Sequence, residues 1–463
     1  MTKYDACIVG GGAAALGSLL ALLQAKPDAM VVQIQPRSES GNNRTIEQNQ
    51  LGKFTPQRTH LGVPASYIEK DDARVILSKS SGGLSDYWSA SLFATQQEAN
   101  AVSDSFFDSI SQYITVVGGQ GEFPSIFSDR LNSGLNFDYV DKFKEYFENT
   151  KNCRIGSNRT AFKHVQPLSL CKACGSCIHG CGDDRFFRPN NMISQLSNIK
   201  KFEQFEGLVA TLEETSDGVK IRLVDGRSIE SKVVFLAAGI LGTPRIVAET
   251  LNTPAELTVF DNLMMVNFFA SLKPTHKASL NKNFGFSELA GLYSNPPTQQ
   301  DFNFFLISSI PQFAFEKNPI LNFAFKSIYN IAHRHFFVVS LYGNRHQYKE
   351  LKLKLNKSNY WDIEDVKTVG YVDFKSSKQN LVYALGKNTH FHLTSKLMRT
   401  SVHYAGAIDC LESHKHQASK VCDNVLVVDS STRGEAFDSH PPTLSIILDA
   451  WTKTLDYLND GRF

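Results

Sequence analysis

A glycine-rich turn near the N-terminus of this chain limits the folds that the chain can adopt. The strand-like run at residues 4–9 leads into Gly10-Gly11-Gly12, and residues 13–24 form an apolar run with helical character. A second strand-like run follows at residues 30–35. This succession of strand, tight turn, helix and strand is the first unit of a doubly wound nucleotide-binding fold.

The turn itself has the chemistry of a dinucleotide site. Gly10, Gly12 and Ala15 fit the pattern G-x-G-x-x-A, with Ala13 and Ala14 between them. Gly10 permits the tight turn, Gly12 lets backbone N–H groups approach a pyrophosphate, and Ala15 is small enough for close packing of helix on sheet. The N-terminus of the helix adds partial positive charge. We therefore predict that these five residues bind a dinucleotide.

The end of the second strand departs from the usual pattern. An acidic residue normally accepts hydrogen bonds from a ribose there, but this chain has Gln35, with Arg37 two residues later. A glutamine can still hydrogen-bond a ribose hydroxyl without carrying charge. Gln35 is therefore predicted to contact the cofactor, and Arg37 leaves room for an atypical adenosine end.

A chain of 463 residues exceeds the usual size of one hydrophobic core, so two domains are expected. Short strand-like runs at 208–213, 219–224 and 232–236, separated by turn signals, would complete the nucleotide-binding sheet. Residues 253–400 are rich in Phe and strand formers. We predict an α/β fold in which residues 1–252 and 401–463 form a discontinuous Rossmann-like domain and residues 253–400 form an antiparallel α+β substrate domain.

The charge and hydropathy of the chain limit the kinds of partner that it can bind. Lys and Arg number 48 against 46 Asp and Glu, which gives no basic field for nucleic acid. No apolar run reaches membrane-spanning length, and no signal-peptide pattern precedes the first strand. The prediction is a cytoplasmic protein without a transmembrane segment, or one that contacts a membrane only at its surface.

Half of the eight cysteines fall within eleven residues. Cys171, Cys174, Cys177 and Cys181 have the spacing C-x2-C-x2-C-x3-C, which wraps one loop around an iron–sulfur cluster. Gly182 follows where ferredoxins place Pro. We predict iron–sulfur ligation by these four thiolates. A structural zinc, which usually separates its cysteine pairs by a longer loop, and disulfides or unligated thiols stay open as alternatives.

Three further segments resemble the glucose-methanol-choline oxidoreductase family. Residues 234–245 read V-F-L-A-A-G-I-L-G-T-P-R, and residues 82–88 read G-G-L-S-D-Y-W, with Leu84 in place of a small residue. The third segment is C-terminal, where residues 401–407 read S-V-H-Y-A-G-A, residues 427–430 read V-V-D-S, and residues 438–443 read D-S-H-P-P-T. Ala407 departs from the family's Thr, and nothing in 253–400 carries the resemblance.

The resemblance implies that the dinucleotide is FAD. It also implies which further residues contact the cofactor, namely Gly82, Gly83, Ser85, Trp88, Ala238, Gly239, Thr243, Asp429, Ser430, Pro441 and Thr443.

Two histidines are the candidate catalytic residues. Oxidation of an alcohol by hydride transfer requires a base within reach of the hydroxyl, and an imidazole suits this task near neutral pH. By resemblance His403 is the base, and His440 orients the hydroxyl and stabilises the developing alkoxide. Structural roles are expected for His333, His335, His390 and His392.

The predicted function is FAD-dependent oxidation of a CH–OH group in a small alcohol or sugar. Some members of the resembled family hold a 4Fe-4S or 3Fe-4S cluster beside FAD. A cluster at residues 171–181 would make the chain a dehydrogenase that passes electrons to an acceptor protein or quinone. The alternatives are an oxygen-dependent alcohol oxidase without a cluster and a non-redox flavin-containing lyase. An electron-carrying binding module would leave both histidines without a task.

Overall fold

The computed structural model of the 463-residue chain describes 30 segments of secondary structure and their connections. The residues described are 3–36, 65–78, 80–87, 91, 93, 104–111, 114–117, 153–158, 160–163, 187–196, 201–272, 289–294, 302–309, 335–356, 360–386, 390–408 and 420–460. Within these ranges, no helix combines the length and apolar character needed to cross a membrane.

The first layer is a sheet with a parallel centre. Its strands follow the order β21-β22-β11-β1-β2-β8, and the hairpin β9–β10 joins it through β11. Their bounds are β1 Lys3–Val9, β2 Val31–Gln35, β8 Phe202–Glu206, β9 Val209–Thr215, β10 Gly218–Leu223, β11 Ser228–Leu236, β21 Lys420–Cys422 and β22 Val425–Val427. Strands β8, β2, β1, β11 and β22 pair in parallel. The carboxyl ends of these strands therefore meet at one edge, where open α/β sheets bind their ligands.

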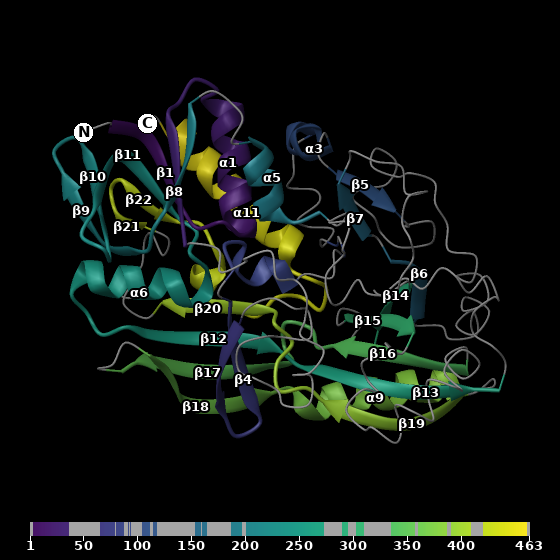
Figure 1. Ribbon diagram of the computed structural model, residues 1–463. Helices are drawn as coiled ribbons and strands as arrows, with labels where there is room; N and C mark the ends of the chain where they lie inside the picture. The colour runs from purple at the N-terminus through teal and green to yellow at the C-terminus, as the bar shows by residue number, and fades with distance from the viewer. Residues whose placement is uncertain are drawn as a thin grey trace, which may run out of the picture.

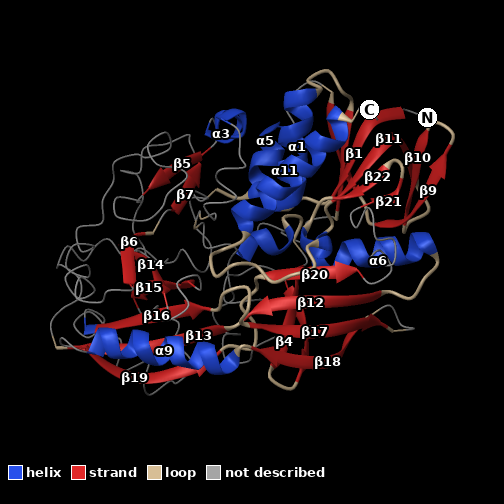
Figure 2. Ribbon diagram, turned by 180° about the vertical axis from the view of Figure 1, so that it is seen from behind, coloured by secondary structure: helices blue, strands red, loops and turns tan. Residues whose placement is uncertain are grey.

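Three helices cover one face of this sheet (Figures 1 and 2). They are α1 Ala13–Ala25, α5 Pro189–Leu196 and α11 Thr443–Asn459. Helix α1 packs closely on α11, since a Cβ added at Gly17 would lie 2.2 Å from the carbonyl oxygen of Ile447. The first and last helices of the chain thus share one core with the inner strands, including Phe235 and Trp451.

Two antiparallel sheets form the second half of the molecule. One has the order β18-β17-β12-β20 and the other β19-β13-β16-β15-β14-β6. Their strands are β6 Cys153–Ser157, β12 Glu256–Asn262, β13 Met264–Ser271, β14 Leu289–Ser294, β15 Phe302–Ser309, β16 Phe336–Tyr342, β17 Tyr348–Leu355, β18 Trp361–Val369, β19 His390–Leu397 and β20 Tyr404–Ile408. Helix α9 (Tyr371–Gly386) packs on the six-stranded sheet, and α6 (Gly239–Leu251) lies between the parallel sheet and the four-stranded sheet (Figure 1).

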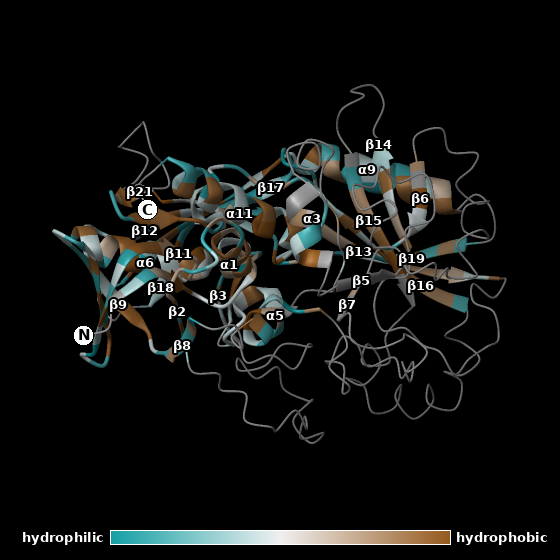
Figure 3. Ribbon diagram, turned by 90° about the horizontal axis from the view of Figure 1, so that it is seen from above, coloured by the Kyte–Doolittle hydropathy of each residue, from teal (hydrophilic) through white to brown (hydrophobic). Residues whose placement is uncertain are grey.

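Smaller elements connect these layers. They are the hairpin of β3 Ala65–Lys70 and β4 Ala73–Ser78, the pair of β5 Ile114–Val117 and β7 Thr160–Lys163, the helix α3 Asp104–Ser111, and two 3-10 helices at Gly83–Tyr87 and Ser430–Thr432. The β3–β4 hairpin crosses the four-stranded sheet (Figure 1). Hydrophobic residues concentrate along the strands of the sheets (Figure 3), as expected for elements that bury at least one face.

The elements predicted around the nucleotide site agree with the structure to within four residues at each end. The runs at 4–9, 13–24 and 30–35 are β1, α1 and β2, and the three later strand-like runs are β9, β10 and β11. The antiparallel character predicted for 253–400 is also present. The strand β12, inside that range, pairs with β20, which lies in the segment predicted for the first domain. The domain boundaries themselves stay a prediction.

Candidate cofactor and active site

The glycine turn lies at the carboxyl end of β1, as its sequence predicts. Gly10 has φ +128°, and a Cβ at this position would lie 2.1 Å from the carbonyl oxygen of Ala237 at the end of β11. Only glycine adopts this backbone without strain. The carbonyl of Gly10 is also held by a hydrogen bond, because the buried Gln33 side chain donates to it at 2.7 Å. The side-chain oxygen of Gln33 in turn accepts a hydrogen bond from Gln204.

The predicted flavin-contacting loop reaches this turn. The carbonyl oxygen of Ser81 lies 2.4 Å from a Cβ built at Gly11, and that of Gly82 lies 3.2 Å from one built at Gly12. The Ser85 hydroxyl donates to the Gly82 carbonyl at 2.5 Å within the loop, and its oxygen lies 3.7 Å from a Cβ built at Gly12. The glycine turn and the loop seventy residues later are therefore in close contact. A side chain at Gly11 or Gly12 would displace this loop.

Two buried acceptors beside Gly11 have no hydrogen-bond partner in the described part of the chain. They are Oε1 of Gln35, at the end of β2, and Oδ1 of Asn190, in the first turn of α5. The Asn190 amide nitrogen donates to Ser81 Oγ at 2.8 Å, which directs Oδ1 toward the turn. Unpaired buried acceptors are costly, and ribose hydroxyls are donors that would satisfy them. These residues fit an FAD whose adenosine end lies against the turn.

A carboxylate joins the motif after β11 to the C-terminal motif. Oδ2 of Asp429 accepts the backbone N–H of Gly239 at 2.8 Å and the hydroxyl of Thr243 at 2.5 Å, and Oδ1 accepts the N–H of Ser431 at 3.0 Å. The Thr243 oxygen also accepts the N–H of Ala238 at 3.1 Å. Asp429 and Thr243 thus hold the two motifs together through protein contacts, and their direct contact with FAD stays a prediction.

The C-terminal motif also approaches the strand that follows His403. Ser430 Oγ donates to the Tyr404 carbonyl at 3.0 Å. Pro441 and Thr443 are buried at the N-terminus of α11, directly after His440. Their predicted contacts with the cofactor are not tested by any contact within the protein.

The candidate base has an apolar environment. The His403 imidazole stacks on the Tyr342 ring, with centroids 4.9 Å apart and planes 12° apart, and its Nδ1 is buried without a partner. Burial, followed by the nearby charge of His440, lowers the pKa of His403 from 6.5 to about 3. The ring is therefore neutral at neutral pH and free to accept a proton.

His440 lies close enough to affect the charge of His403, so the fold brings the predicted pair together. It is buried, and its Nε2 forms a 2.9 Å hydrogen bond with Ser445 Oγ, one turn into α11. This contact orients the ring from the helix that follows it. The pair is thus assembled from the loop before β20 and the loop before α11.

The remaining predicted site residues lie outside the described residues. These are Trp88 and the four cysteines Cys171, Cys174, Cys177 and Cys181. Within the ranges that are described, no three His, Cys, Asp or Glu side chains converge as metal ligands.

Three of the other histidines, His335, His390 and His392, contact backbone or side chains of the antiparallel sheet. His335 Nδ1 lies 2.9 Å from the Ser271 carbonyl, His392 Nε2 lies 2.7 Å from Ser395 Oγ, and His390 contacts Phe337 edge-on. His333 lies beyond the described segments.

The structure combines a Rossmann-like sheet, a glycine turn at its carboxyl edge and an antiparallel second half, and solved structures share this fold, so the predicted fold class is confirmed. The chain is similar to pyridoxine 4-oxidase from Mesorbium loti, with a TM-score of 0.61 and 12% identity over 99% of each chain. It is also similar to formate oxidase from Aspergillus oryzae RIB40, in a structure concerned with FAD modification, with a TM-score of 0.59 and 11% identity over 100% of this chain and 99% of that one.

A second structure of formate oxidase matches with a TM-score of 0.55, 12% identity and the same coverage. At such low identity the likeness establishes the fold. No protein-family model and no curated protein sequence matches the chain.

Four further residues contact the glycine turn, its neighbouring loop or the segment that carries His403, and the sequence did not predict them. Gln33 and Asn190 contact the glycine turn and its loop, Tyr342 stacks on the candidate base, and Asp261 binds the backbone of Ser401. None belongs to a recognisable motif, so a single sequence offers no signal for them.

Proposed function

We propose that the chain is an FAD-dependent oxidoreductase that oxidises a CH–OH group, with oxygen as the electron acceptor. The observation that carries the proposal is the juxtaposition of two imidazoles, the half-buried His403 and the buried His440, in a fold whose glycine turn has unpaired acceptors beside it for a dinucleotide. The oxidase assignment is supported by fold neighbours that are oxidases by name. It takes precedence over the dehydrogenase expected from the cysteine run.

FAD would be held by the turn at Gly10 and Gly12, by Gln35 and by the loop that contains Gly82 and Ser85. Bound FAD would supply the hydride acceptor and would return the electrons to oxygen. The substrate would lose a hydride from carbon and a proton from oxygen, and would leave as a carbonyl compound.

The protein's own contribution is the handling of the proton. Neutral His403 accepts the hydroxyl proton, and His440 hydrogen-bonds the same oxygen. A pKa of about 3 would make a free imidazole a weak base. Negative charge that develops on the substrate oxygen in the same buried site raises this pKa, since an opposite charge favours the imidazolium. The base is therefore activated when the substrate begins to react.

The test is a spectrum followed by turnover. Purified protein loaded with FAD should lose its flavin absorption when an alcohol is added without air, and should produce one hydrogen peroxide per carbonyl when air is admitted. Replacing His403 by Gln should retain FAD and lose most of the anaerobic bleaching. Conversion of a substrate without air, while the flavin remains oxidised throughout, would instead point to the lyase.

A second candidate rests on the cysteine spacing at residues 171–181. In this case the chain is an iron–sulfur dehydrogenase, and its electrons pass from the flavin through the cluster to an acceptor protein or quinone. Iron and sulfide analysis after anaerobic purification separates the two candidates. Three or four irons per flavin, lost in Cys174→Ser, together with slow peroxide formation, would favour the dehydrogenase.

A further inference from the structure

The segment that carries His403 has an unusual backbone. Val402 has φ +66°, in the left-handed region that β-branched residues rarely adopt. Such a conformation costs energy and persists only where the surroundings impose it, and such residues cluster at functional sites. The contacts that impose this turn therefore also determine where the His403 ring points.

The principal contact is a buried carboxylate on β12. Asp261, 1% exposed, accepts the Ser401 hydroxyl at 2.6 Å and the Ser401 N–H at 3.1 and 3.2 Å. The Ser401 oxygen in turn accepts the N–H of His403 at 3.1 Å. A continuous chain of hydrogen bonds thus runs from Asp261 through Ser401 to the backbone of the candidate base.

Flanking contacts complete the turn. Thr400 Oγ1 accepts the N–H of Val402 at 3.0 Å and lies 2.6 Å from the Tyr404 hydroxyl. That hydroxyl also accepts the N–H of Ile76 on β4 at 3.1 Å. The turn is therefore held from the β3–β4 hairpin as well as from β12.

The next residue along β12 holds the other histidine loop. Asn262, 2% exposed, donates from Nδ2 to the carbonyl of Phe437 at 2.7 Å and to that of Gly343 at 3.0 Å. Phe437 lies three residues before His440. Because successive side chains of a strand point to opposite faces, two adjacent residues can hold two different loops.

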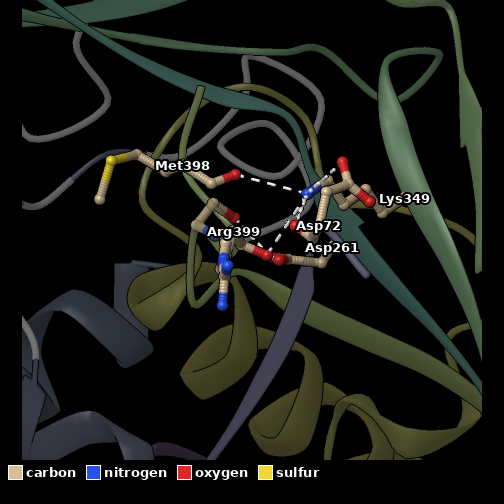
Figure 4. Close-up of polar contacts among 6 residues, drawn as sticks. Asp72, Asp261, Lys349, Met398 and Arg399 are labelled. Atoms are coloured by element: carbon tan, nitrogen blue, oxygen red, sulfur yellow. Dashed lines mark hydrogen bonds and ion pairs between the residues drawn. The ribbon is translucent and has the colours of Figure 1, made fainter. Parts of the chain in front are cut away.

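A buried lysine lies opposite the Asp261 carboxylate on the neighbouring strand. Lys349, 2% exposed, is the register partner of Asp261 on β17. Its amine hydrogen-bonds the carbonyls of Asp72, Met398 and Arg399 and forms a 3.1 Å ion pair with Asp72 (Figure 4). Burial raises the pKa of Asp261 to about 6, against the opposing effects of its hydrogen bonds and of Lys349.

We propose that Asp261 and Asn262 are positioning residues for the histidine pair: Asp261 sets the turn that carries His403 through Ser401, and Asn262 sets the loop that carries His440. The end of one strand of the antiparallel half thereby fixes the spacing of the two imidazoles. The proposal rests on the proposed function for its catalytic consequence, but the geometry concerns the protein alone.

The experiment measures the NMR signals of the two imidazoles. Histidine labelled with carbon-13 at Cε1 is incorporated into the FAD-loaded protein, and the signals of His403 and His440 are assigned by their loss in His403→Gln and His440→Gln. Each signal is then followed by NMR through a pH titration in the variants Asp261→Asn, Ser401→Ala, Ser401→Thr and Asn262→Leu. Turnover, flavin content and melting temperature are measured on the same samples.

We expect Asp261→Asn and Ser401→Ala to shift the His403 signal and raise its pKa by at least about one unit, as a misplaced ring gains contact with water. The Ser401→Thr variant retains the hydroxyl and should restore the signal. Asn262→Leu should shift His440 more than His403. In turnover, kcat should fall about 10- to 100-fold with KM nearly unchanged, because a small displacement of a catalytic group affects chemistry more than binding.

Two controls separate positioning from general damage. Asp365→Asn removes an exposed carboxylate on β18 of the same sheet and should change nothing. Asn267→Ala removes a buried 3.1 Å hydrogen bond to the Val339 carbonyl in the other sheet, and should lower the melting temperature without moving either imidazole signal.

Unmoved histidine signals in both Asp261→Asn and Ser401→Ala, with losses that match those of Asn267→Ala, would overturn the proposal. If the wild type oxidises no alcohol, the proposed function fails, while the NMR comparison still decides whether Asp261 and Asn262 position the pair. If Asp261→Asn does not fold, the comparison of Ser401→Ala with Ser401→Thr gives the same decision.

Discussion

Replacing Gly10 by alanine would place a methyl group 2.1 Å from the Ala237 carbonyl oxygen, where ordinary contact begins at 3.4 Å. The ends of β1 and β11 would have to separate by more than about 1 Å, although Ala237 donates its N–H to the Val9 carbonyl at 2.9 Å. The backbone adds a second cost, since φ +128° is accessible essentially to glycine alone and costs other residues about 1–3 kcal/mol.

Together these effects amount to at least about 3 kcal/mol, which corresponds to roughly 100-fold in an equilibrium constant. The apoprotein can relieve the clash by opening the turn. Binding of FAD requires the closed turn, so the free-energy cost of the substitution lowers the affinity for FAD. We therefore expect FAD to bind about 100-fold more weakly to Gly10→Ala. Flavin fluorescence during titration of the apoprotein measures this affinity, and a thermal melt checks the fold.

A matched control separates the two costs. Gly226 has φ +87° in the β10–β11 turn, and a Cβ there would meet nothing within 4 Å. Gly226→Ala should therefore cost only about 1–2 kcal/mol of stability and leave FAD affinity unchanged. If Gly10→Ala bound FAD within about threefold of wild type, the glycine turn would not be the dinucleotide site.

Three further outcomes follow from the site. Asn190→Ala should weaken FAD binding about fivefold, the value of one hydrogen bond, when measured in the same titration; unchanged affinity would remove Asn190 from the cofactor site. Because the folded-state pKa of His403 is about 3 and its ordinary value is 6.5, the unfolded chain binds the extra proton first as pH falls. Wild type should therefore lose stability between pH 6.5 and 3 relative to His403→Gln in urea unfolding, and parallel curves would contradict the burial of the ring. Removing the stacked ring in Tyr342→Ala should raise the pKa of His403 toward 6.5 in an NMR titration, whereas Tyr342→Phe should leave it low; equal pKa values in both variants would show that the stack does not exclude water.

Elements whose signal is local could be predicted from the sequence alone. Residues 3–36 show strand, glycine turn, helix and strand at the predicted positions, and the place of Gln35 follows from the length of β2. The strands β9, β10 and β11 could be predicted equally well, because their alternating apolar and polar residues and the turn residues between them lie within a few positions of each other. The histidine pair could be named from motifs of the C-terminal segment, although its catalytic role stays a proposal.

The surroundings of these residues depend on contacts between distant parts of the chain and could not be predicted from the sequence. Asp261 meets Ser401 across 140 positions of sequence, and Tyr342 meets His403 across 61, through antiparallel registers that no local pattern specifies. Asn190 reaches the glycine turn because α5 packs on α1, and β8 joins β2 after an excursion of 166 residues. Local propensity acts over one or two turns of chain, whereas these contacts depend on the simultaneous burial of distant apolar faces. The motifs thus indicated the candidate reacting groups, and packing determined their environment.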